Sequence, residues 1–134
     1  MIRALACALA VSVLEGAQQP GVRNPRELKA VELLAQRRPG VPPRVRFEWD
    51  QVAGANEYLL RGHWTTPTSW SVQTTDYHVT PKTATSWGGG GAGQHVRFDV
   101  TLPEGHHSWT VVALFGSGGV GDFGRPTAVT FELR

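Results

Sequence analysis

Histidines are the side chains of this sequence best suited to hold a metal ion. His106 and His107 are adjacent, whereas His63, His78 and His95 stand alone. Adjacent residues on a strand point to opposite faces, so His106 and His107 are not expected to share one ion. The chain contains no Cys-x-x-Cys or His-x-x-x-His spacing. We therefore expect no metal and no other cofactor.

The acidic and hydroxyl residues do not form a catalytic pattern. Asp50, Asp99 and Glu104 fall on outward strand positions or turns, where carboxylates are solvated. Acid–base catalysis needs paired, desolvated carboxylates. The Gly-Ser-Gly at 116–118 reads as a loop, not as the strand-to-helix elbow of a serine nucleophile. The glycine run at 88–93 lacks the Lys-Ser/Thr of a phosphate-binding loop. We expect that the chain is not an enzyme.

Aromatic residues gather in one stretch of loop and edge sequence: Trp64, Trp70, Tyr77 and Trp87. Two interpretations stay open. The rings fill the ends of a sandwich core, or they are exposed anchors for a protein partner, because Trp and Tyr dominate interface energetics. The same rings could stack on sugars, although the polar residues that normally converge on a sugar cannot be identified here. All four are candidate partner-binding residues.

The elements that would position these residues are strands. Val45, Phe47 and Trp49 alternate with charged residues, which is typical of a half-buried strand. Similar stretches follow at 58–62, 71–80, 96–102, 107–115 and 129–133. The 16 Gly and 9 Pro residues suit short strands joined by turns. The pattern predicts an all-β antiparallel sandwich over residues 44–134.

A short helix is expected before the strands, within a linker region at 21–43. Residues 24–27 read Asn-Pro-Arg-Glu, which combines an N-cap, a first-turn proline and a capping box. Apolar residues then recur at helical spacing until Pro39. The predicted helix spans about 25–37, and its apolar stripe has to be covered by the sandwich or by another protein. Its candidate partner-binding residues are Leu28, Val31, Leu34, Arg37 and Arg38.

Residues 1–20 are treated as one apolar segment, in which an uncharged run follows Arg3. The run at 4–14 would cover about 16 Å as a helix, against a hydrocarbon core of ~30 Å, so a full membrane span is not expected. It resembles a secretory signal peptide, but Glu15 occupies a position where cleavage favours a small residue. Cleavage, retention and lipidation at Cys7 stay open. If the segment is retained, its candidate contact residues are Leu5, Leu9 and Leu14.

Charge is distributed unevenly along the chain. The formal net charge is +2, but the first third is basic and the remainder is mildly acidic. A basic leading segment suits an anionic membrane surface or an acidic protein. The basic residues form no dense run and the predicted folded part is acidic, so nucleic acid is not an expected partner.

Several motifs resemble fibronectin type III domains, over about ninety residues. Phe47-x-Trp49 and Tyr58-x-Leu60 look like that family's second and third strands, and residues 102–113 resemble the corner into its sixth strand. Residues 126–131 resemble part of its last hairpin. The pair His106-His107 departs from the family, because many bacterial members have an aromatic residue after the corner glycine. The resemblance implies binding or spacing roles rather than a reaction.

These observations predict a non-enzymatic structural or interaction module outside the cytoplasm, periplasmic or secreted. The expected role is an accessory subunit that stabilises a larger bacterial membrane-associated complex. Respiratory and photosynthetic assemblies are both open as the host, and no residue selects either. The expected partners are proteins of that complex, with membrane-surface contact through the N-terminal segment. The alternative is a secreted carbohydrate-binding module.

Overall fold

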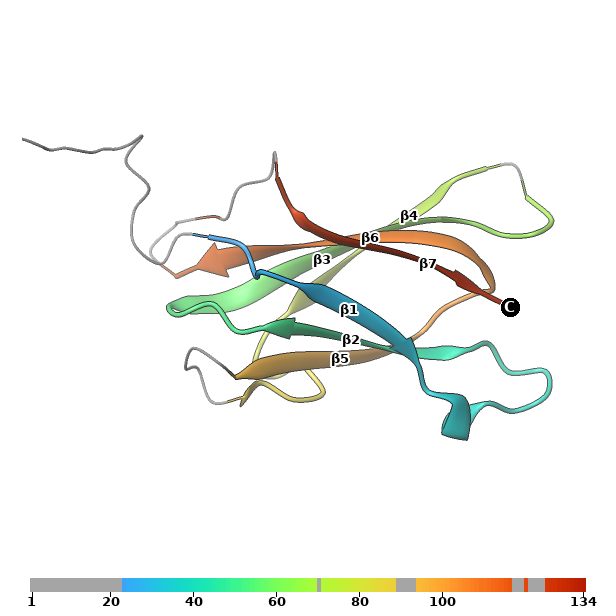
Figure 1. The fold of residues 1–134 in the computed structure, drawn as a ribbon, viewed down its shortest axis with the longest axis horizontal. Coiled ribbons are helices and arrows are strands. Elements are labelled where there is room, and N and C mark those ends of the chain that lie inside the picture. The colour runs from blue at the N-terminus through green and yellow to red at the C-terminus, as the bar shows by residue number, and fades with distance from the viewer. Residues whose placement is uncertain (1–22, 70, 89–93, 117–119, 121–124) are drawn as a thin grey trace, which may run out of the picture.

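The computed structural model describes residues 23–69, 71–88, 94–116, 120 and 125–134. They form an antiparallel β-sandwich of two sheets, with the strand orders β1-β2-β5 and β4-β3-β6-β7 (Figure 1). The strands are β1 (Leu28–Glu32), β2 (Arg44–Asp50), β3 (Ala55–Thr65), β4 (Gln73–Val79), β5 (His95–Thr101), β6 (Gly105–Phe115) and β7 (Thr127–Leu133). A single 3-10 turn, η1 (Leu34–Gln36), follows β1. The predicted all-β sandwich is confirmed.

Aromatic side chains fill the space between the sheets. Phe47 and Trp49 of β2 are buried, as are Tyr58 of β3 and Trp109 of β6. The ring centroids of Phe47 and Trp109 lie 4.8 Å apart, and those of Trp49 and Tyr58 lie 5.3 Å apart. Each buried ring contributes about 1.5–3 kcal/mol or more through burial alone. These contacts between the two sheets confirm the inward alternation predicted for β2, β3 and β6.

Gly62 of β3 allows the Trp109 indole to lie directly against the β3 backbone. A Cβ at this position would lie 2.3 Å from the indole ring. Trp64 and Tyr77 are nearly parallel to Trp109, at interplanar angles of 5° and 15° and centroid distances of 6.0 Å in both cases. The inner face of the four-stranded sheet therefore carries a row of parallel rings that meets Phe47 from the other sheet.

The predicted helix at 25–37 is wrong. Residues 28–32 form β1, which pairs antiparallel with β2 along its whole length. Leu28 and Ala30 face the core, so inward side chains recur every two residues, as in a strand. Leu28, Val31 and Leu34 also fit a helical spacing, and this spacing led to the wrong prediction. Pairing with β2 gives this segment backbone partners and core contacts, which outweigh a local helix preference. The sandwich therefore includes residues before Arg44 that the sequence assigned to a linker.

Within the described ranges, no helix has both the length and the apolar character needed to cross a membrane. The apolar segment predicted at 1–20 lies outside those ranges.

Candidate functional site

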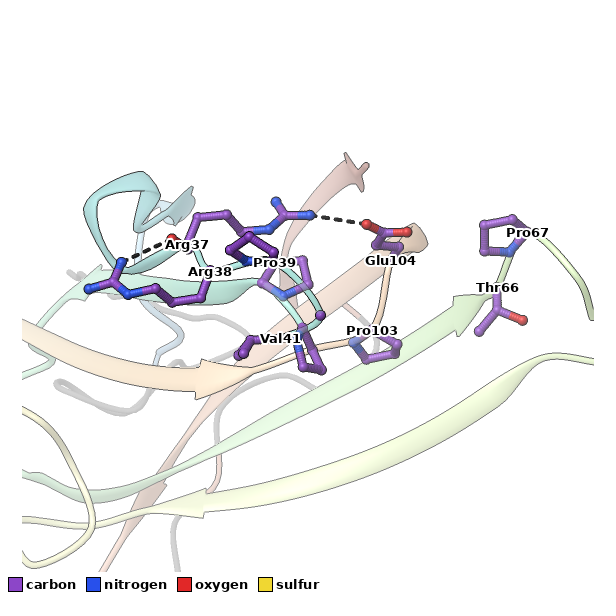
Figure 2. Close-up of a pocket in the computed structure, with 11 residues that line it drawn as sticks. Arg37, Arg38, Pro39, Val41, Thr66, Pro67, Pro103 and Glu104 are labelled. Carbon is purple, nitrogen blue, oxygen red and sulfur yellow. Dashed lines mark hydrogen bonds and ion pairs between the residues drawn. The ribbon is translucent and has the colours of Figure 1, made fainter.

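An open groove of about 740 Å³ lies at one end of the sandwich. Residues 37–43, 66–67 and 103–104 line it, so three chain connections contribute to it (Figure 2). The first connection consists of residues 33–43. It joins β1 to β2 and projects beyond the ends of the strands (Figure 1). We call residues 33–43 the arm.

Prolines make the groove apolar and stiff. The prolines that line it are Pro39, Pro42, Pro43, Pro67 and Pro103. Proline has no N–H group and a fixed φ, so it ends strands and keeps its ring in place. The Leu102 N–H donates to the Pro43 carbonyl at 3.0 Å, which ties the base of the arm to the end of β5. Gly40, with φ at 76°, reverses the arm, and the Val41 N–H donates to Arg38 O at 3.2 Å.

Arg37 fixes one wall of the groove through three contacts. Its guanidinium donates to the carboxylates of Glu32 at 2.5 Å and Glu104 at 3.0 Å. It also donates to the backbone carbonyl of Arg134 at 3.0 Å. These partners belong to β1, to the turn before β6 and to the residue after β7. Arg37 therefore holds the arm against both sheets, and the Arg37–Glu104 pair balances charge at the rim (Figure 2).

The arm and the end of β1 expose apolar side chains. Leu34 is 72% exposed and Val41 is 50% exposed, while Val31 at the base of the arm is 58% exposed. Arg38 donates to Ala35 O at 3.3 Å and to Arg37 O at 2.9 Å. Single exposed apolar residues are common on protein surfaces. Exposed apolar residues that occur together with an apolar groove are typical of an interaction surface.

His107 supports the wall opposite the arm. Its Nε2 lies 2.8 Å from the carbonyl oxygen of Pro103, so the β5–β6 turn is tied to β6. The ring is 3% exposed and stacks on Phe131 at an interplanar angle of 3°. Burial lowers the pKa of His107 below its ordinary value, because the charged imidazolium loses hydration. The groove wall at Pro103 is thus fixed by a neutral, buried imidazole.

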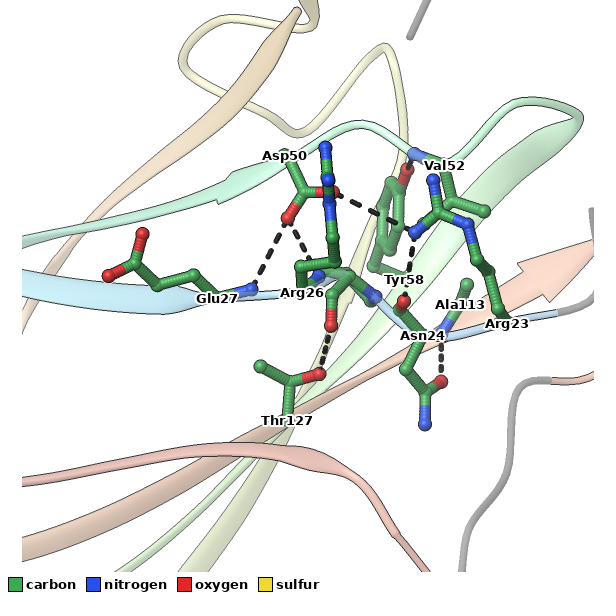
Figure 3. A network of polar contacts seen from close by, with 10 residues as sticks. Arg23, Asn24, Arg26, Glu27, Asp50, Val52, Tyr58, Ala113 and Thr127 are labelled. Carbon is green, nitrogen blue, oxygen red and sulfur yellow. Dashed lines mark hydrogen bonds and ion pairs between the residues drawn. The ribbon is translucent and has the colours of Figure 1, made fainter. Parts of the chain in front are cut away.

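A polar network at the opposite end of the sandwich fixes the chain that enters β1 (Figure 3). The Asp50 carboxylate accepts backbone N–H bonds from Arg26 at 2.8 Å and Glu27 at 3.3 Å. Asn24 accepts from the Ala113 N–H at 3.1 Å, on β6. The Thr127 hydroxyl donates to the Pro25 carbonyl. The residues that the sequence favoured as a helix cap therefore bind neighbouring strands.

The structure places the predicted helix residues in two environments. Leu28 is 5% exposed and packs in the core. Val31 and Leu34 are exposed, and Arg37 and Arg38 line the groove. Val31 lies in β1, whereas Leu34, Arg37 and Arg38 lie in the arm, so these residues come from a strand and a turn instead of a helix.

The predicted aromatic residues do not gather at the groove. Trp64 and Tyr77 stack on Trp109, and Trp87 lies against Tyr58 at a centroid distance of 5.5 Å. All three are partly buried against the core, so they give no particular support to a sugar-stacking surface. The remaining predicted contact residues lie outside the described ranges: Leu5, Leu9, Leu14 and Trp70.

The histidine pair faces two ways, as the sequence predicted. His107 is buried, whereas His106 is exposed and lies 3.5 Å from the Glu132 carboxylate. Among the residues that the structure describes, no group of three or more His, Cys, Asp or Glu could hold a metal ion.

Sequence reasoning missed the groove itself. It treated Pro39 as the end of a helix, the residues up to 43 as part of a linker, and residues 102–113 as the corner into a strand. The signal that could have found the groove is the concentration of prolines next to strand ends, but their convergence depends on how the two sheets pack. With an apolar lining and a single ion pair at its rim, the groove suits an apolar side chain or an extended segment of a partner.

The fold and the groove define the class: a two-sheet antiparallel β-sandwich with an open apolar groove at one end. No model of a known protein family matches the chain, and a search of curated protein sequences finds no match.

Proposed function

We propose that this chain is a non-enzymatic interaction module of the fibronectin type III kind. Support comes from the places of the motifs that carry the resemblance. Phe47 and Trp49 lie in β2, and Tyr58 and Leu60 lie in β3. The 102–113 motif leads into β6, and residues 127–133 form β7, the last strand. These are the second, third, sixth and final positions that the resemblance implies.

The module contacts a protein partner through the arm and the groove. The observation that carries this proposal is a proline-lined concavity in which Val41 is half exposed, on an arm that also exposes Leu34. Exposed apolar groups that adjoin a stiff apolar groove gain from being covered, and stiff prolines lose little conformational freedom on binding. In its native setting the module acts outside the cytoplasm, as an accessory subunit of a larger bacterial membrane-associated complex.

A site-specific photo-crosslink tests the partner surface. The crosslinking amino acid p-benzoylphenylalanine is placed at position 34 of the full chain, expressed in its native host. The matched control places it at position 82, an exposed position in the turn after β4. We expect a discrete protein adduct from position 34 and none from position 82. Equal adducts from both positions, or none from position 34, would contradict the proposal.

The intact mass of the native protein tests its placement outside the cytoplasm. A mass that lacks the leading apolar segment, or one that adds a lipid at Cys7, supports export. A full-length unmodified chain that fractionates with the cytoplasm would overturn that part of the proposal and leave the interaction surface to the crosslinking test.

A further inference from the structure

A shallow depression of about 470 Å³ lies on the four-stranded sheet. Its described lining consists of residues 63–65, Val72, residues 106–108 and residues 130–131, none of which lines the groove. In each of these strand segments the odd or even positions that face the core alternate with outward ones. The outward positions His63, His106, Ser108 and Thr130 are exposed. The depression therefore lies on the outer face of the sheet.

The strand register brings five polar side chains together in this depression. His63 of β3 lies opposite Ser108 of β6, and Ser108 lies opposite Thr130 of β7. Thr65 lies opposite His106 in the next outward row. Directly opposite side chains on one face have Cβ atoms about 4.5–5.5 Å apart. Two imidazoles and three hydroxyls from three neighbouring strands thus share one concave surface.

Most of these groups have no protein partner. Among the residues that the structure describes, the side chains of His63, Thr65, Ser108 and Thr130 form no hydrogen bond and no ion pair. His106 lies 3.5 Å from the Glu132 carboxylate. The outer face of the other sheet differs, because its polar side chains are largely paired with one another, as in the two-bond contact of Arg46 with Asp99. The depression therefore offers a set of free hydrogen-bonding groups.

The chemistry of this set suits a ligand that only accepts hydrogen bonds. Hydroxyl and imidazole groups can all donate, and no side chain of the described lining is a carboxylate. Phosphate and sulfate groups present several acceptor oxygens, and charged donors bind them most strongly. We propose that the depression binds an oxoanion, either as a free ion or as the phosphate or sulfate group of a small ester.

The carboxylates that surround the depression are held by arginines. Asp76 accepts two bonds from Arg61, at 2.8 Å and 3.0 Å, and Glu132 accepts one from Arg134 at 2.7 Å. The hydrogen bond from Arg61 lowers the pKa of Asp76, and the one from Arg134 lowers the pKa of Glu132. Each carboxylate is thus balanced by a cation, so neither leaves an uncompensated negative charge beside the oxoanion.

The two exposed imidazoles make the binding depend on pH. Imidazole typically gains its second proton between pH 5 and 8, so His63 and His106 add positive charge to this face as the pH falls. His107 lies beneath the depression and stays neutral, because burial lowers its pKa. Farther along the same face, His78 lies 2.5 Å from Glu57. Oxoanion binding should therefore be stronger at pH 5.5 than at pH 7.5.

Nuclear magnetic resonance of the histidine side chains in the full chain tests the proposal. Sulfate is titrated against chloride of equal ionic strength, because its charge is the same at both pH values. At pH 5.5 the signals of His63 and His106 should shift saturably, with a dissociation constant on the order of 1–10 mM, since exposed contacts are screened. His95 is the internal control, because it lies on the other sheet beside Glu48.

Two results of this titration would overturn the proposal. One is the absence of saturable shifts at His63 and His106. The other is an equal shift of His95, which would mean that sulfate acts through general charge screening.

Variants separate a built site from simple attraction to two imidazoles. The double variant Ser108→Ala, Thr130→Ala keeps both histidines and should weaken sulfate binding by about fivefold or more, since it removes two donors. Thr110→Ala is the matched control: it lies on the same strand and face as Ser108 but does not line the depression. This variant should bind like the unaltered chain. Unchanged binding by the double variant would refute the site.

The source of the oxoanion is distinguished by comparing phenyl phosphate with inorganic phosphate at pH 5.5. Val72 is 61% exposed and lines the depression, where it adjoins the organic part of an ester. Tighter binding of phenyl phosphate identifies an ester, and equal binding identifies the free ion. Glucose is the neutral probe, and shifts with glucose but not with sulfate would overturn the proposal. The arm and the groove contribute nothing to this site, so its failure leaves the proposed function standing.

Discussion

The imidazole of His107 has one proton arrangement that suits its surroundings. Its Nδ1 accepts a hydrogen bond from the Trp109 indole N–H at 3.1 Å, so the proton is on Nε2, which donates to Pro103 O. A second proton on Nδ1 would face the indole N–H. Trp64 and Phe131 cover the faces of the ring, and the neighbouring His106 adds a repulsive charge when it is protonated. The folded state therefore favours neutral His107.

This arrangement predicts acid-sensitive stability. The unfolded chain takes up a proton near pH 6.5, whereas the folded pKa of His107 lies lower. Protonation of the unfolded state then favours unfolding, so the stabilisation is complete above about pH 6.5 and is lost as the pH falls. For one proton, the free energy of unfolding changes by at most about 1.4 kcal/mol per pH unit.

Urea unfolding at pH 7.5, 6.5 and 5.5 measures this effect. The midpoint of the unaltered chain should fall with pH, and that of His107→Gln should fall less steeply, whatever its absolute value. His106→Gln is the control. His106 is exposed, so this variant should keep most of the pH dependence of the unfolding midpoint. Parallel slopes for the unaltered chain and His107→Gln would contradict the assignment.

Gly62 predicts a second effect at the residue scale. In Gly62→Ala the new methyl group meets the Trp109 ring at 2.3 Å, and this ring is fully buried. Overpacking of this kind costs about 1–3 kcal/mol, because the indole must leave its place among the parallel rings. Ser108→Ala, at an exposed position on the neighbouring strand, should change the free energy of unfolding by less than about 0.5 kcal/mol. Urea unfolding compares the two, and equal stabilities would be evidence against the packing described.

At the scale of elements, β1 marks the limit of what the sequence could predict. The alternation in β2, β3, β5, β6 and β7 is visible locally, because each of these strands has one face toward a core. In β1, Leu28, Val31 and Leu34 satisfy a helical period, and residues 24–27 imitate a helix start. Only the antiparallel pairing with β2, in which Leu28 lies opposite Trp49, decides between a helix and a strand. That pairing is non-local, so a local pattern could not contain it.

The groove was beyond sequence reasoning for a related reason. Pro39 was predicted as the end of a helix that the structure does not contain, and the lining joins positions near 40, 66 and 103. Arg37 was predicted as a basic helix end, whereas its partners Glu104 and Arg134 lie far along the chain. The strands after Arg44 could be predicted from local alternation, but the meeting of their ends depends on sheet order and register.

The Asp50 network predicts how firmly β1 is attached. Asp50→Ala removes the acceptor for the Arg26 and Glu27 N–H groups, and a hydrogen bond to a charged group is worth about 1.5–3 kcal/mol. Amide hydrogen exchange in residues 26–32 should accelerate by about tenfold or more. Asp76→Ala is the control, because Asp76 pairs with Arg61 on an exposed face of the other sheet. Similar exchange at β1 in both variants would argue against the network.

At the scale of the whole molecule, the shared aromatic core predicts a single cooperative transition. Trp49 belongs to one sheet and Trp109 to the other, and Phe47 and Tyr58 make contacts between the sheets. Neither sheet keeps its core when the other is lost. Tryptophan fluorescence and far-ultraviolet circular dichroism should therefore give coincident urea transitions. Separate midpoints would mean that the two sheets unfold independently.

The two ends of the sandwich have different connections. The polar network holds residues 24–27 at one end, and the arm, the groove and the C-terminus lie at the other (Figure 1). Tension applied between residue 23 and Arg134 would run parallel to the strands. It would slide β1 along β2 and β7 along β6, loading the bonds of each ladder together instead of opening them one after another. We therefore expect the described part of the chain to extend little when it is pulled along its long axis.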